Sequence, residues 1–413
     1  MLPVYFEDRL TGRIEAANPG LVFSYAESWM ADDTAFAVSL TMPLDKPDHE
    51  RQVATPWFAN LLPEERQLER VGRLLGRSQG DVYGLLEETG RDTAGALSIG
   101  GAESIGTAKY RQLDDQALAG VIDRLPERPL LAGEGEVTMS LAGAQSKVAV
   151  AVFSGDIYLP LGGAASTHIV KPESERLYAS VENELLCMSL ARDCGLAVAS
   201  VEMGLAEGRK FLLVERYDRR VVAAGKVERH HQEDFCQLTS RYPTEKYETD
   251  RGPGFRELFE TLDRWSSGAA RDRLTLLDLT ILACCIGDTD RHAKNFSFLL
   301  SGGAVRLAPG YDLMSAMLYE GVTRNLAMKV AGRQRAEHLH RRHWERFAAG
   351  VGLAPAATAN RVEALATRIA DRIQAKADEL GKATVGDAKA FRLFADRIEE
   401  RSVQIAANSR RNA

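Results

Sequence analysis

The sequence predicts an α+β fold in two lobes. Short β-rich runs separated by turn residues dominate up to residue 230, whereas helical periodicity dominates from His231 onward. A chain of 413 residues is long enough for two or three domains that each bury a core. We therefore expect an α/β N-terminal lobe with an extra β-rich subdomain, followed by an all-helical C-terminal lobe. The expected regions are the subdomain at 1–105, a connector at 106–136, the N-terminal lobe at 137–230 and the C-terminal lobe at 231–413.

The composition is that of an ordinary soluble globular protein, with 45% hydrophobic and 27% charged residues. A net charge of −6 excludes a global field that attracts nucleic acid. Residues 1–8 lack the features of a signal peptide, and the longest apolar run, 274–286, is too short to span a bilayer. The five cysteines form no C-x2-C pair, so we interpret them as reduced core residues. These features predict a cytoplasmic protein with no membrane partner.

The first region reads as a packing module. Its β-rich runs are broken by Asp-Arg, Asn-Pro-Gly and Asp-Asp turns, which predicts a small curved sheet. A stretch containing Asn60-Leu61-Leu62-Pro63-Glu64 then precedes a helix that extends to about Arg77, and a glycine-bracketed turn covers 90–97. None of these residues has a side chain suited to catalysis. The predicted strands are 4–7, 21–25 and 36–40.

A candidate phosphate-binding loop follows the connector, directly before a β-run at 148–153. Small residues let backbone N–H groups approach a phosphate, and Lys147 adds positive charge. The residues alone leave open a plain turn between strands, because the loop has one glycine and no G-K-[ST] sequence. The candidate residues are Ala142, Gly143, Ala144, Gln145, Ser146 and Lys147.

A lysine and two glutamates fit the next part of a nucleotide site. Lys171 lies near the end of a predicted strand at 167–172, and the predicted helix at 179–194 carries Glu182 and Glu184. Protein kinases pair such a lysine, which neutralises the α- and β-phosphates, with a glutamate of the following helix. A solvated strand-end lysine is the alternative, and the sequence does not choose between the two glutamates.

Two further strands are predicted at 198–203 and 211–215. The chain then leaves the sheet through Glu215, Arg216 and Tyr217. Backbone groups of such an exit segment commonly bind adenine, so these three residues are the candidate hinge.

The pattern that best indicates chemistry lies between an apolar helix at 274–286 and a predicted strand at 296–300. Asp290 is followed five positions later by Asn295, and Asp312 comes about one hairpin further on. Protein kinases use this order: the first Asp accepts the proton of the substrate hydroxyl, and the Asn and second Asp bind Mg²⁺. The alternative is that these are turn-forming residues, whose side chains bond their own backbone.

This loop resembles the catalytic loop of the HipA family of serine/threonine kinases, which are toxins of bacterial toxin–antitoxin pairs. The stretches Asn-Leu-Leu-Pro-Glu at 60–64, Gly-Arg-Asp-x-x-Gly-Ala-Leu at 90–97 and Gln-Glu-Asp-Phe-Cys-Gln at 232–237 are similar to the same family. The resemblance covers nearly the whole chain. It implies a two-lobed, protein-kinase-like fold with ATP in the cleft between the lobes.

The resemblance also implies roles for individual residues. Asp290 would be the catalytic base, Asn295 and Asp312 the Mg²⁺ ligands, and Ser140 a site of autophosphorylation. The implied ATP-binding residues are 142–147, Lys171, Glu215, Arg216, Tyr217, His292, Lys294, Asn295, Tyr311 and Asp312. The segment 313–325 resembles neither a D-F-G motif nor a eukaryotic activation loop, which leaves the docking of the substrate open.

The family further implies two kinds of partner. One is a small helix-turn-helix antitoxin, HipB-like, that ties the kinase to operator DNA. The other is a protein substrate, a translation factor such as an aminoacyl-tRNA synthetase. Two other functions stay open: a small-molecule kinase of related fold, and a non-catalytic subunit of an operator complex. The offsets of His338, His340 and His343 do not share one helix face, which argues against zinc.

Overall fold

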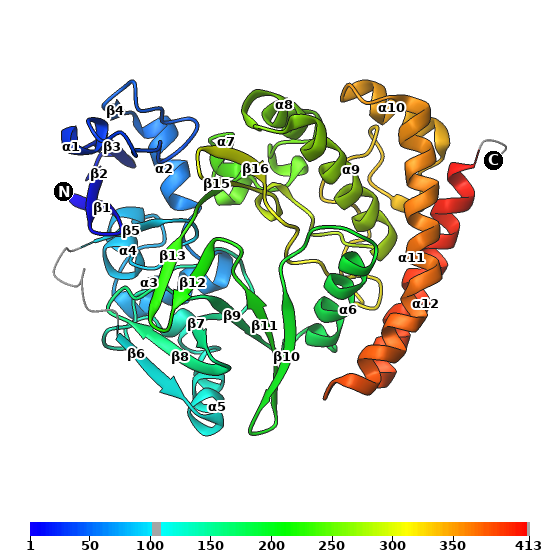
Figure 1. The fold of residues 1–413 in the computed structure, drawn as a ribbon, viewed down its shortest axis with the longest axis horizontal. Coiled ribbons are helices and arrows are strands. Elements are labelled where there is room, and N and C mark those ends of the chain that lie inside the picture. The colour runs from blue at the N-terminus through cyan, green and yellow to red at the C-terminus, as the bar shows by residue number, and fades with distance from the viewer. Residues whose placement is uncertain (101–108, 411–413) are drawn as a thin grey trace. The chain divides into compact units, whose positions relative to one another are not determined.

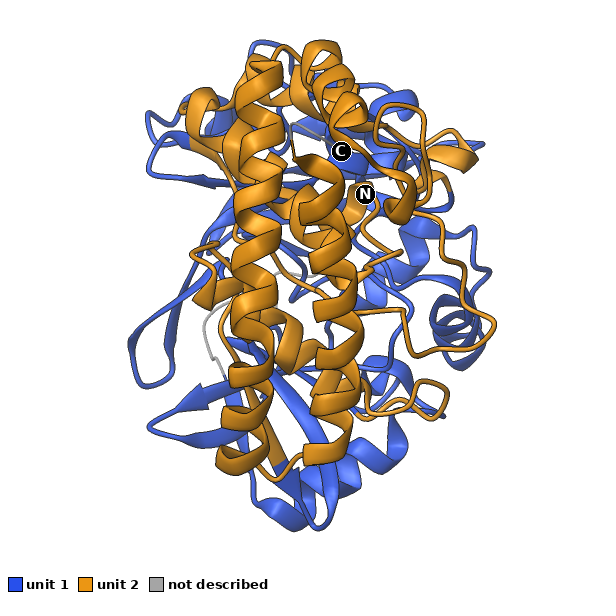
Figure 2. Cartoon of the chain, turned by 90° about the vertical axis from the view of Figure 1, so that its right-hand side faces the viewer, with its two compact units in different colours: residues 1–172, 205–244, 298–304 blue, residues 173–204, 245–297, 305–413 orange. Residues whose placement is uncertain are grey.

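A computed structural model describes residues 1–100 and 109–410 (Figure 1). The predicted boundary at 105/106 lies outside these residues. The chain forms two compact units (Figure 2). Unit 1 comprises 1–172, 205–244 and 298–304, and unit 2 comprises 173–204, 245–297 and 305–413.

Unit 1 begins with an antiparallel sheet of order β4-β3-β2-β1-β5. The predicted strands at 4–7 and 21–25 are confirmed as β1 and β3. The prediction of a strand at 36–40 is wrong. There Val38 N donates to the hydroxyl of Tyr25 at 2.7 Å and Leu40 N donates to Glu233 Oε1 at 2.9 Å, so side chains take the place of a neighbouring strand. The strands are β1 (Leu2–Phe6), β2 (Arg9–Ala16), β3 (Leu21–Tyr25), β4 (Asp48–His49) and β5 (Leu97–Ile99).

Helices cover this sheet and close its core. Trp29, Phe23, Trp57 and Phe58 are among its largest fully buried side chains. Burial of an aromatic ring removes about 150–250 Å² of surface from water, so this cluster is a major source of the stability of the sheet. The helices are α1 (Glu27–Met30), α2 (Arg51–Ala59), α3 (Glu65–Leu75) and α4 (Val82–Thr89).

A second sheet of unit 1 carries the predicted strands around the phosphate loop and the lysine. The predicted strand at 148–153 is confirmed as β7, in which five of six side chains are buried. Its core packs against α5, which lies within the region predicted as a connector. The sheet has the order β10-β11-β9-β7-β8-β6, and β10 crosses the boundary between the two units along the chain. The elements are β6 (Lys109–Leu113), α5 (Asp115–Arg124), β7 (Val148–Phe153), β8 (Asp156–Leu161), β9 (His168–Pro172), β10 (Val201–Ala206) and β11 (Arg209–Glu215).

The region after residue 230 is mainly helical but also contains short strands. A capping box of Asp234 and Gln237 starts α7 at the point where β14 ends. These remaining short elements are the hairpin β12 (Arg219–Ala223) and β13 (Lys226–Arg229), then β14 (His231–Asp234), α7 (Phe235–Leu238), β15 (Ser297–Ser301) and β16 (Ala304–Leu307). The 3-10 helices are η2 (Pro129–Leu131), η3 (Pro243–Glu245), η4 (Glu248–Asp250), η5 (Ala293–Asn295) and η6 (Ala336–His338).

Unit 2 is built from long helices. The predicted helices at 179–194 and 274–286 are confirmed as α6 and α9, and α9 starts five residues earlier than predicted. Residues 279–286 are all buried, so this helix is hydrophobic on every side near its end. The last two helices bury apolar side chains at helical spacing as well, at Leu365, Ile369, Ile373, Phe391, Phe394, Ala395 and Ile398. The helices are α6 (Ser180–Asp193), α8 (Phe255–Trp265), α9 (Ala269–Ile286), α10 (Arg341–Gly350), α11 (Pro355–Ala383) and α12 (Ala388–Ser409).

The five cysteines are all buried and none forms a disulfide, as predicted. In the described part of the chain, every helix is too short or too polar to cross a lipid bilayer.

Candidate active site

The loop that carries Asp290 leaves the buried end of α9. Gly287 ends this helix at φ +67°, and a Cβ at this position would lie 2.5 Å from Met317 Cγ. Only glycine fits both the left-handed backbone and the close contact. Residues 286–289 are buried, whereas the Asp290 side chain is 63% exposed. An exposed carboxylate therefore projects from a rigid support, which suits a group that must meet a substrate.

Arg291 holds this loop together. Its guanidinium donates to the backbone oxygens of Asn295 at 2.9 Å and of Tyr311 at 2.8 Å. It also donates to the backbone oxygen of Asp312, at 3.0 Å. One side chain thus fixes three predicted nucleotide-site residues. Asn295 lies at the end of the loop, and Tyr311 and Asp312 lie beyond the hairpin that follows. Arg291 is 3% exposed, so these charge-assisted bonds are made by a buried guanidinium.

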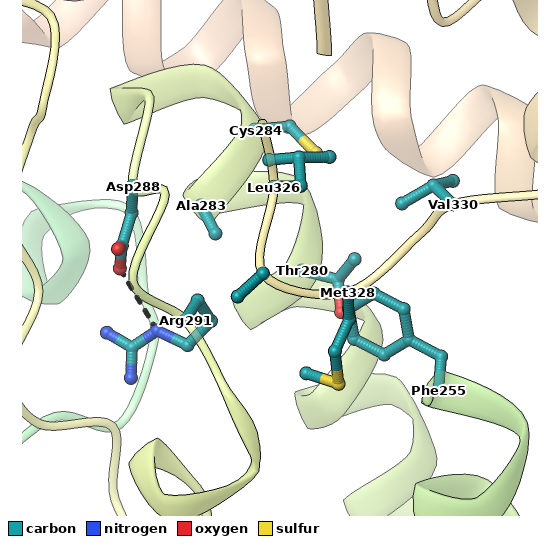
Figure 3. A pocket seen from close by; sticks show the side chains of 10 residues that line it. Phe255, Thr280, Ala283, Cys284, Asp288, Arg291, Leu326, Met328 and Val330 are labelled. Carbon is teal, nitrogen blue, oxygen red and sulfur yellow. Dashed lines mark hydrogen bonds and ion pairs between the residues drawn. The ribbon is translucent and has the colours of Figure 1, made fainter. Parts of the chain in front are cut away.

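Asp288 balances the charge of Arg291. Its Oδ2 lies 3.1 Å from Nε of the arginine, and its Oδ1 accepts the backbone N–H of Asp290 at 3.0 Å (Figure 3). Burial raises the pKa of the Asp288 carboxyl to about 7, and the guanidinium opposes this shift. Figure 3 also shows the pair at the edge of a small pocket that α9 and the segment 326–330 line. The loop is therefore organised by an ion pair inside unit 2.

Tyr311 and Asp312 are fixed to the same loop. The Tyr311 hydroxyl lies 2.7 Å from Lys294 O, to which it donates, and 2.7 Å from Ser297 Oγ. Asp312 has a left-handed backbone at φ 57°, a conformation that costs a non-glycine residue free energy. The bond from Arg291 to its carbonyl stabilises this conformation. Such strained residues cluster at functional sites, which is consistent with a ligand role for Asp312.

The donors of the loop fit a magnesium ion. The side-chain Nδ2 of Asn295 donates to Asp290 O at 2.7 Å, which fixes the orientation of the amide, so its oxygen end is the one that can bind a cation. Asp312 supplies a carboxylate, and Arg291 binds the backbone carbonyls of both Asn295 and Asp312. Oxygen donors from one or two side chains, completed by phosphate oxygens and water, are what Mg²⁺ prefers.

The neighbours of the Asp290 carboxylate come from two segments of unit 2. Tyr247 donates its hydroxyl to Asp290 Oδ1. His292 Nε2 lies 3.8 Å from the same oxygen, and the two rings meet edge to face with centroids 5.0 Å apart. Lys294, one of the implied ATP-binding residues, is 6% exposed.

In unit 1 the candidate phosphate loop packs against the stretch at 60–64. Ser140 Oγ donates to Leu61 O at 2.8 Å, and Glu64 N donates to Gly143 O at 3.3 Å. Gly143 has φ +108°, a backbone conformation that residues other than glycine rarely adopt, so the loop favours glycine at this position. Lys147 Nζ itself donates to Ala142 O at 2.7 Å. The residue types of 60–64 gave this stretch no expected role near a site, whereas the structure shows that it supports the loop.

The strand lysine and the exit segment have different surroundings. Lys171 is 6% exposed on β9, opposite Leu212 of β11. Arg216 has its guanidinium in a buried network: it donates to Asp218 Oδ2 at 2.8 Å and to Ser166 Oγ at 2.9 Å. Its backbone N–H donates to Thr167 O at 2.9 Å. The Arg216 side chain therefore has a structural role. The contact of Arg216 with adenine stays a prediction, and its backbone carbonyl is the group that would make this contact.

The same network explains the turn at 90–97. Arg219 Nη2 donates to Asp92 Oδ1 at 3.0 Å, and its Nη1 donates to Asp218 Oδ2 at 2.9 Å. The guanidinium groups hold the pKa of the Asp92 carboxyl below its ordinary value despite its complete burial. The network fixes the turn to the segment that follows β11.

The structure distinguishes the two helix glutamates. Glu182 Oε1 accepts the backbone N–H of Asp387, at the start of α12, at 2.9 Å. Residues i and i+2 of a helix point about 200° apart, so Glu184 faces away from this contact. Both side chains are buried, at 0% and 1% exposure.

Sequence reasoning missed three residues that organise the loop: Asp288, Arg291 and Tyr247. Asp288 and Arg291 had a partial signal: they follow an apolar helix within five residues, and charged side chains that are buried at such a place need a partner of opposite charge. Tyr247 had none, since 43 residues separate it from Asp290.

Comparison with known proteins places these features in a family. The family model described as "HipA N-terminal domain" matches residues 2–100, and "HipA-like C-terminal domain" matches residues 139–377. The chain is 39% identical to Y4mE of Sinorhizobium fredii, which carries the name of a kinase, over 86% of each chain. It is 28% identical to the serine/threonine-protein kinase toxin HipA of Shewanella oneidensis, over 90% of this chain and 87% of that one.

A solved structure gives the same answer for the fold. It is the complex of HipA, HipB and operator DNA from the Shewanella oneidensis toxin–antitoxin system. One of its chains matches 99% of this chain over 98% of its own length, with a TM-score of 0.85 and 26% identity. Because both domain models match in the expected order and the second covers more than half of the sequence, this chain belongs to the HipA family of kinases.

Proposed function

We propose that this chain is a Mg²⁺- and ATP-dependent serine/threonine-protein kinase and the toxin of a HipBA-like toxin–antitoxin system. One observation carries the proposal: Arg291 binds the backbone of Asn295, Tyr311 and Asp312 and so ties together the residues that the kinase order singles out. A vestigial loop would have no need for this buried arginine. The relative named as a serine/threonine-protein kinase toxin supports the choice of acceptor.

In the proposed mechanism, each residue of the loop has one task. Asp290 accepts the proton of the acceptor hydroxyl while the hydroxyl oxygen attacks the γ-phosphorus and ADP leaves. Asn295 and Asp312 would hold Mg²⁺, which neutralises phosphate charge when bound. Arg291 acts through both as a positioning residue. His292 and Lys294 lie on the same loop and are assigned to the γ-phosphate.

The nucleotide-binding residues of unit 1 would hold the rest of ATP. Backbone N–H groups of 142–147 and the charges of Lys147 and Lys171 suit the phosphates, and the backbone at 215–217 suits adenine. Phosphoryl transfer depends mostly on positioning and charge neutralisation, so these contacts contribute to the rate as well as to affinity.

Removal of the proposed metal ligands tests the ATP site. We expect Asn295→Ala and Asp312→Ala to weaken binding of Mg²⁺·ATP by at least tenfold and to change binding of metal-free ATP much less, because Mg²⁺ tolerates poor coordination badly. Calorimetric titrations with Mg²⁺ and with a chelator measure both affinities. Asp371→Ala, an exposed carboxylate on α11, is the matched control. Equal losses in the two titrations would show that Asn295 and Asp312 have a structural role only.

Autophosphorylation at Ser140 is expected to switch the kinase off. Ser140 is fully buried, and its hydroxyl donates to Leu61 O. A phosphoserine adds about −1.5 to −2 charges, which this contact cannot accommodate, so the loop at 140–147 must leave its place. After incubation with Mg²⁺·ATP, mass spectrometry should find phosphate at Ser140, and the phosphorylated protein should bind ATP at least tenfold more weakly. Ser140→Ala should keep its ATP affinity after the same incubation. Phospho-Ser140 protein with unchanged affinity would contradict this mechanism.

We assign the role of the kinase helix glutamate to Glu184. Glu182 is engaged at the start of α12, and Glu184 points the opposite way. Glu184→Gln should therefore lower kcat/KM for ATP by about 10- to 100-fold, in the range typical of a buried charge partner. Glu182→Gln is the control and should lower the melting temperature with little change in KM for ATP. The same loss of kcat/KM in both variants would refute the assignment.

The partners follow from the family. A HipB-like helix-turn-helix antitoxin would bind this chain and link it to operator DNA, because the solved relative is itself a complex of HipA, HipB and operator DNA. The substrate would be a translation factor such as an aminoacyl-tRNA synthetase. Expression of the wild type in a bacterial host should arrest growth, and co-expression of its HipB-like antitoxin should restore it. Asp290→Asn is the inactive control, and arrest by both forms would exclude phosphotransfer as the cause.

A further inference from the structure

Tyr247 contacts the predicted base directly. Its hydroxyl donates to Asp290 Oδ1, and its ring packs edge to face on His292 with centroids 5.0 Å apart. His292 Nε2 lies 3.8 Å from the same Oδ1 atom. Both of these contacts are made at Oδ1, so a tyrosine hydroxyl and a histidine ring restrain the carboxylate of Asp290.

The backbone around Tyr247 is fixed to the rest of unit 2. The N–H groups of Asp250 and Gly252 both donate to Tyr247 O, at 2.9 and 2.8 Å. The backbone oxygen of the preceding residue, Lys246, accepts the N–H of Ala293 of the catalytic loop at 3.3 Å. The carboxylate of the following residue, Glu248, accepts the N–H of Lys329 at 2.5 Å. Hydrogen bonds thus fix the backbone at Tyr247 and at the residues before and after it. The Tyr247 side chain can therefore act as a support for Asp290.

Asp290 needs such a support. Its side chain is 63% exposed. An exposed side chain keeps rotamer freedom unless a neighbouring group restrains it, and a base must lose that freedom before it can act. A base that is itself oriented by a third group is a recurring arrangement in enzymes. The hydroxyl of Tyr247 supplies that third group from a segment that lies far from the catalytic loop in the sequence.

We propose that Tyr247 is the positioning residue of the base: its hydroxyl binds Oδ1 of Asp290 and so fixes the orientation in which the carboxylate meets the acceptor hydroxyl. In the transfer step the acceptor oxygen forms a bond to the γ-phosphorus, the bond from the γ-phosphorus to the bridging oxygen breaks, and ADP leaves. The proton of the acceptor moves to the Asp290 carboxylate. This inference rests on the proposed kinase function.

The first test is Tyr247→Phe, which removes the hydroxyl and keeps the ring on His292. We expect kcat for loss of the γ-phosphate from Mg²⁺·ATP to fall about tenfold, the scale of one hydrogen bond to a charged group at a partly exposed site. Initial rates with γ-labelled ATP count transfer to water and to protein together, so no acceptor need be known. KM for ATP and the calorimetric affinity for Mg²⁺·ATP should stay within twofold of wild type. Tyr242→Phe, the same change on the preceding stretch of chain, should have no effect.

A double-mutant cycle separates positioning from a structural role. If Tyr247 acts through Asp290, then Tyr247→Phe should cause no further loss in an Asp290→Asn background. A structural role would instead lower the melting temperature of Tyr247→Phe and reduce the rate in both backgrounds.

Each remaining outcome overturns the inference. Tyr247→Phe with a wild-type kcat, while Asp290→Asn is inactive, would show that the base needs no support from this residue. A faster Tyr247→Phe would show that the hydroxyl blocks the acceptor position. Wild-type protein that releases no γ-phosphate, or an Asp290→Asn variant as active as wild type, would instead contradict the proposed function on which the inference rests.

Discussion

Asp290→Asn should reduce phosphotransfer by about 10²–10⁴-fold, the usual effect of the loss of a general base. The substitution keeps the size of the side chain and its exposed position after α9, but the amide cannot accept the proton of the acceptor hydroxyl. The backbone of residue 290 can keep both of its contacts, with Asp288 Oδ1 and with Asn295 Nδ2. The variant should therefore bind Mg²⁺·ATP with nearly wild-type affinity and melt at nearly the same temperature.

The rate of γ-phosphate transfer and the calorimetric affinity decide this prediction together. Asp250→Asn, an exposed carboxylate elsewhere in unit 2, is the matched control and should stay active. An Asp290→Asn variant with more than half of the wild-type rate would remove Asp290 from the role of base. A variant that loses ATP binding in parallel would show that the carboxylate serves the nucleotide site and not proton transfer.

Arg291→Met should affect stability and activity at once. The change removes the partner of a buried carboxylate, and a broken buried ion pair costs about 3–5 kcal/mol of the free energy of unfolding. It also removes the donors to the carbonyls of Asn295, Tyr311 and Asp312, so the proposed metal ligands lose their alignment. We expect a clear fall in the urea midpoint of unfolding, together with phosphotransfer reduced at least 10²-fold, as when reacting groups are misplaced by about 1 Å.

A second substitution separates the two effects. Asp288→Asn in the Arg291→Met background removes the unpaired buried charge and should recover part of the urea midpoint, because Asn can still accept the N–H of Asp290. Activity should stay low, since the three carbonyls remain without their donor. Arg361→Met is the control for loss of an ion pair near the surface, and such a pair contributes about 0–1 kcal/mol. Recovery of activity in the double variant would contradict the role of Arg291 as the organiser of the loop.

Local patterns were sufficient for much of the fold. The helix before the loop that carries Asp290 was predictable because its residues from Leu274 onward are almost all apolar. Strand β7 was predictable because a short run of valine, alanine and phenylalanine is typical of a buried strand. The segment 36–40 shows the limit of such patterns. It has the composition of a strand, but Tyr25 and Glu233 take its N–H groups. A prediction from local composition cannot include a partner that lies almost 200 residues away.

The sequence by itself determined the identity and order of the chemical groups: Asp290, Asn295 and Asp312, with a small-residue loop and Lys171 before them. Their types and spacing are local properties, so they can be read along the chain. Only the tertiary structure decided how these groups are supported. Arg291 reaches three carbonyls across 21 residues, Tyr247 reaches Asp290 across 43, and Leu61 accepts the hydroxyl of Ser140 across 79. Such contacts depend on which segments folding brings side by side, and the spacing of residues along a chain does not contain that information.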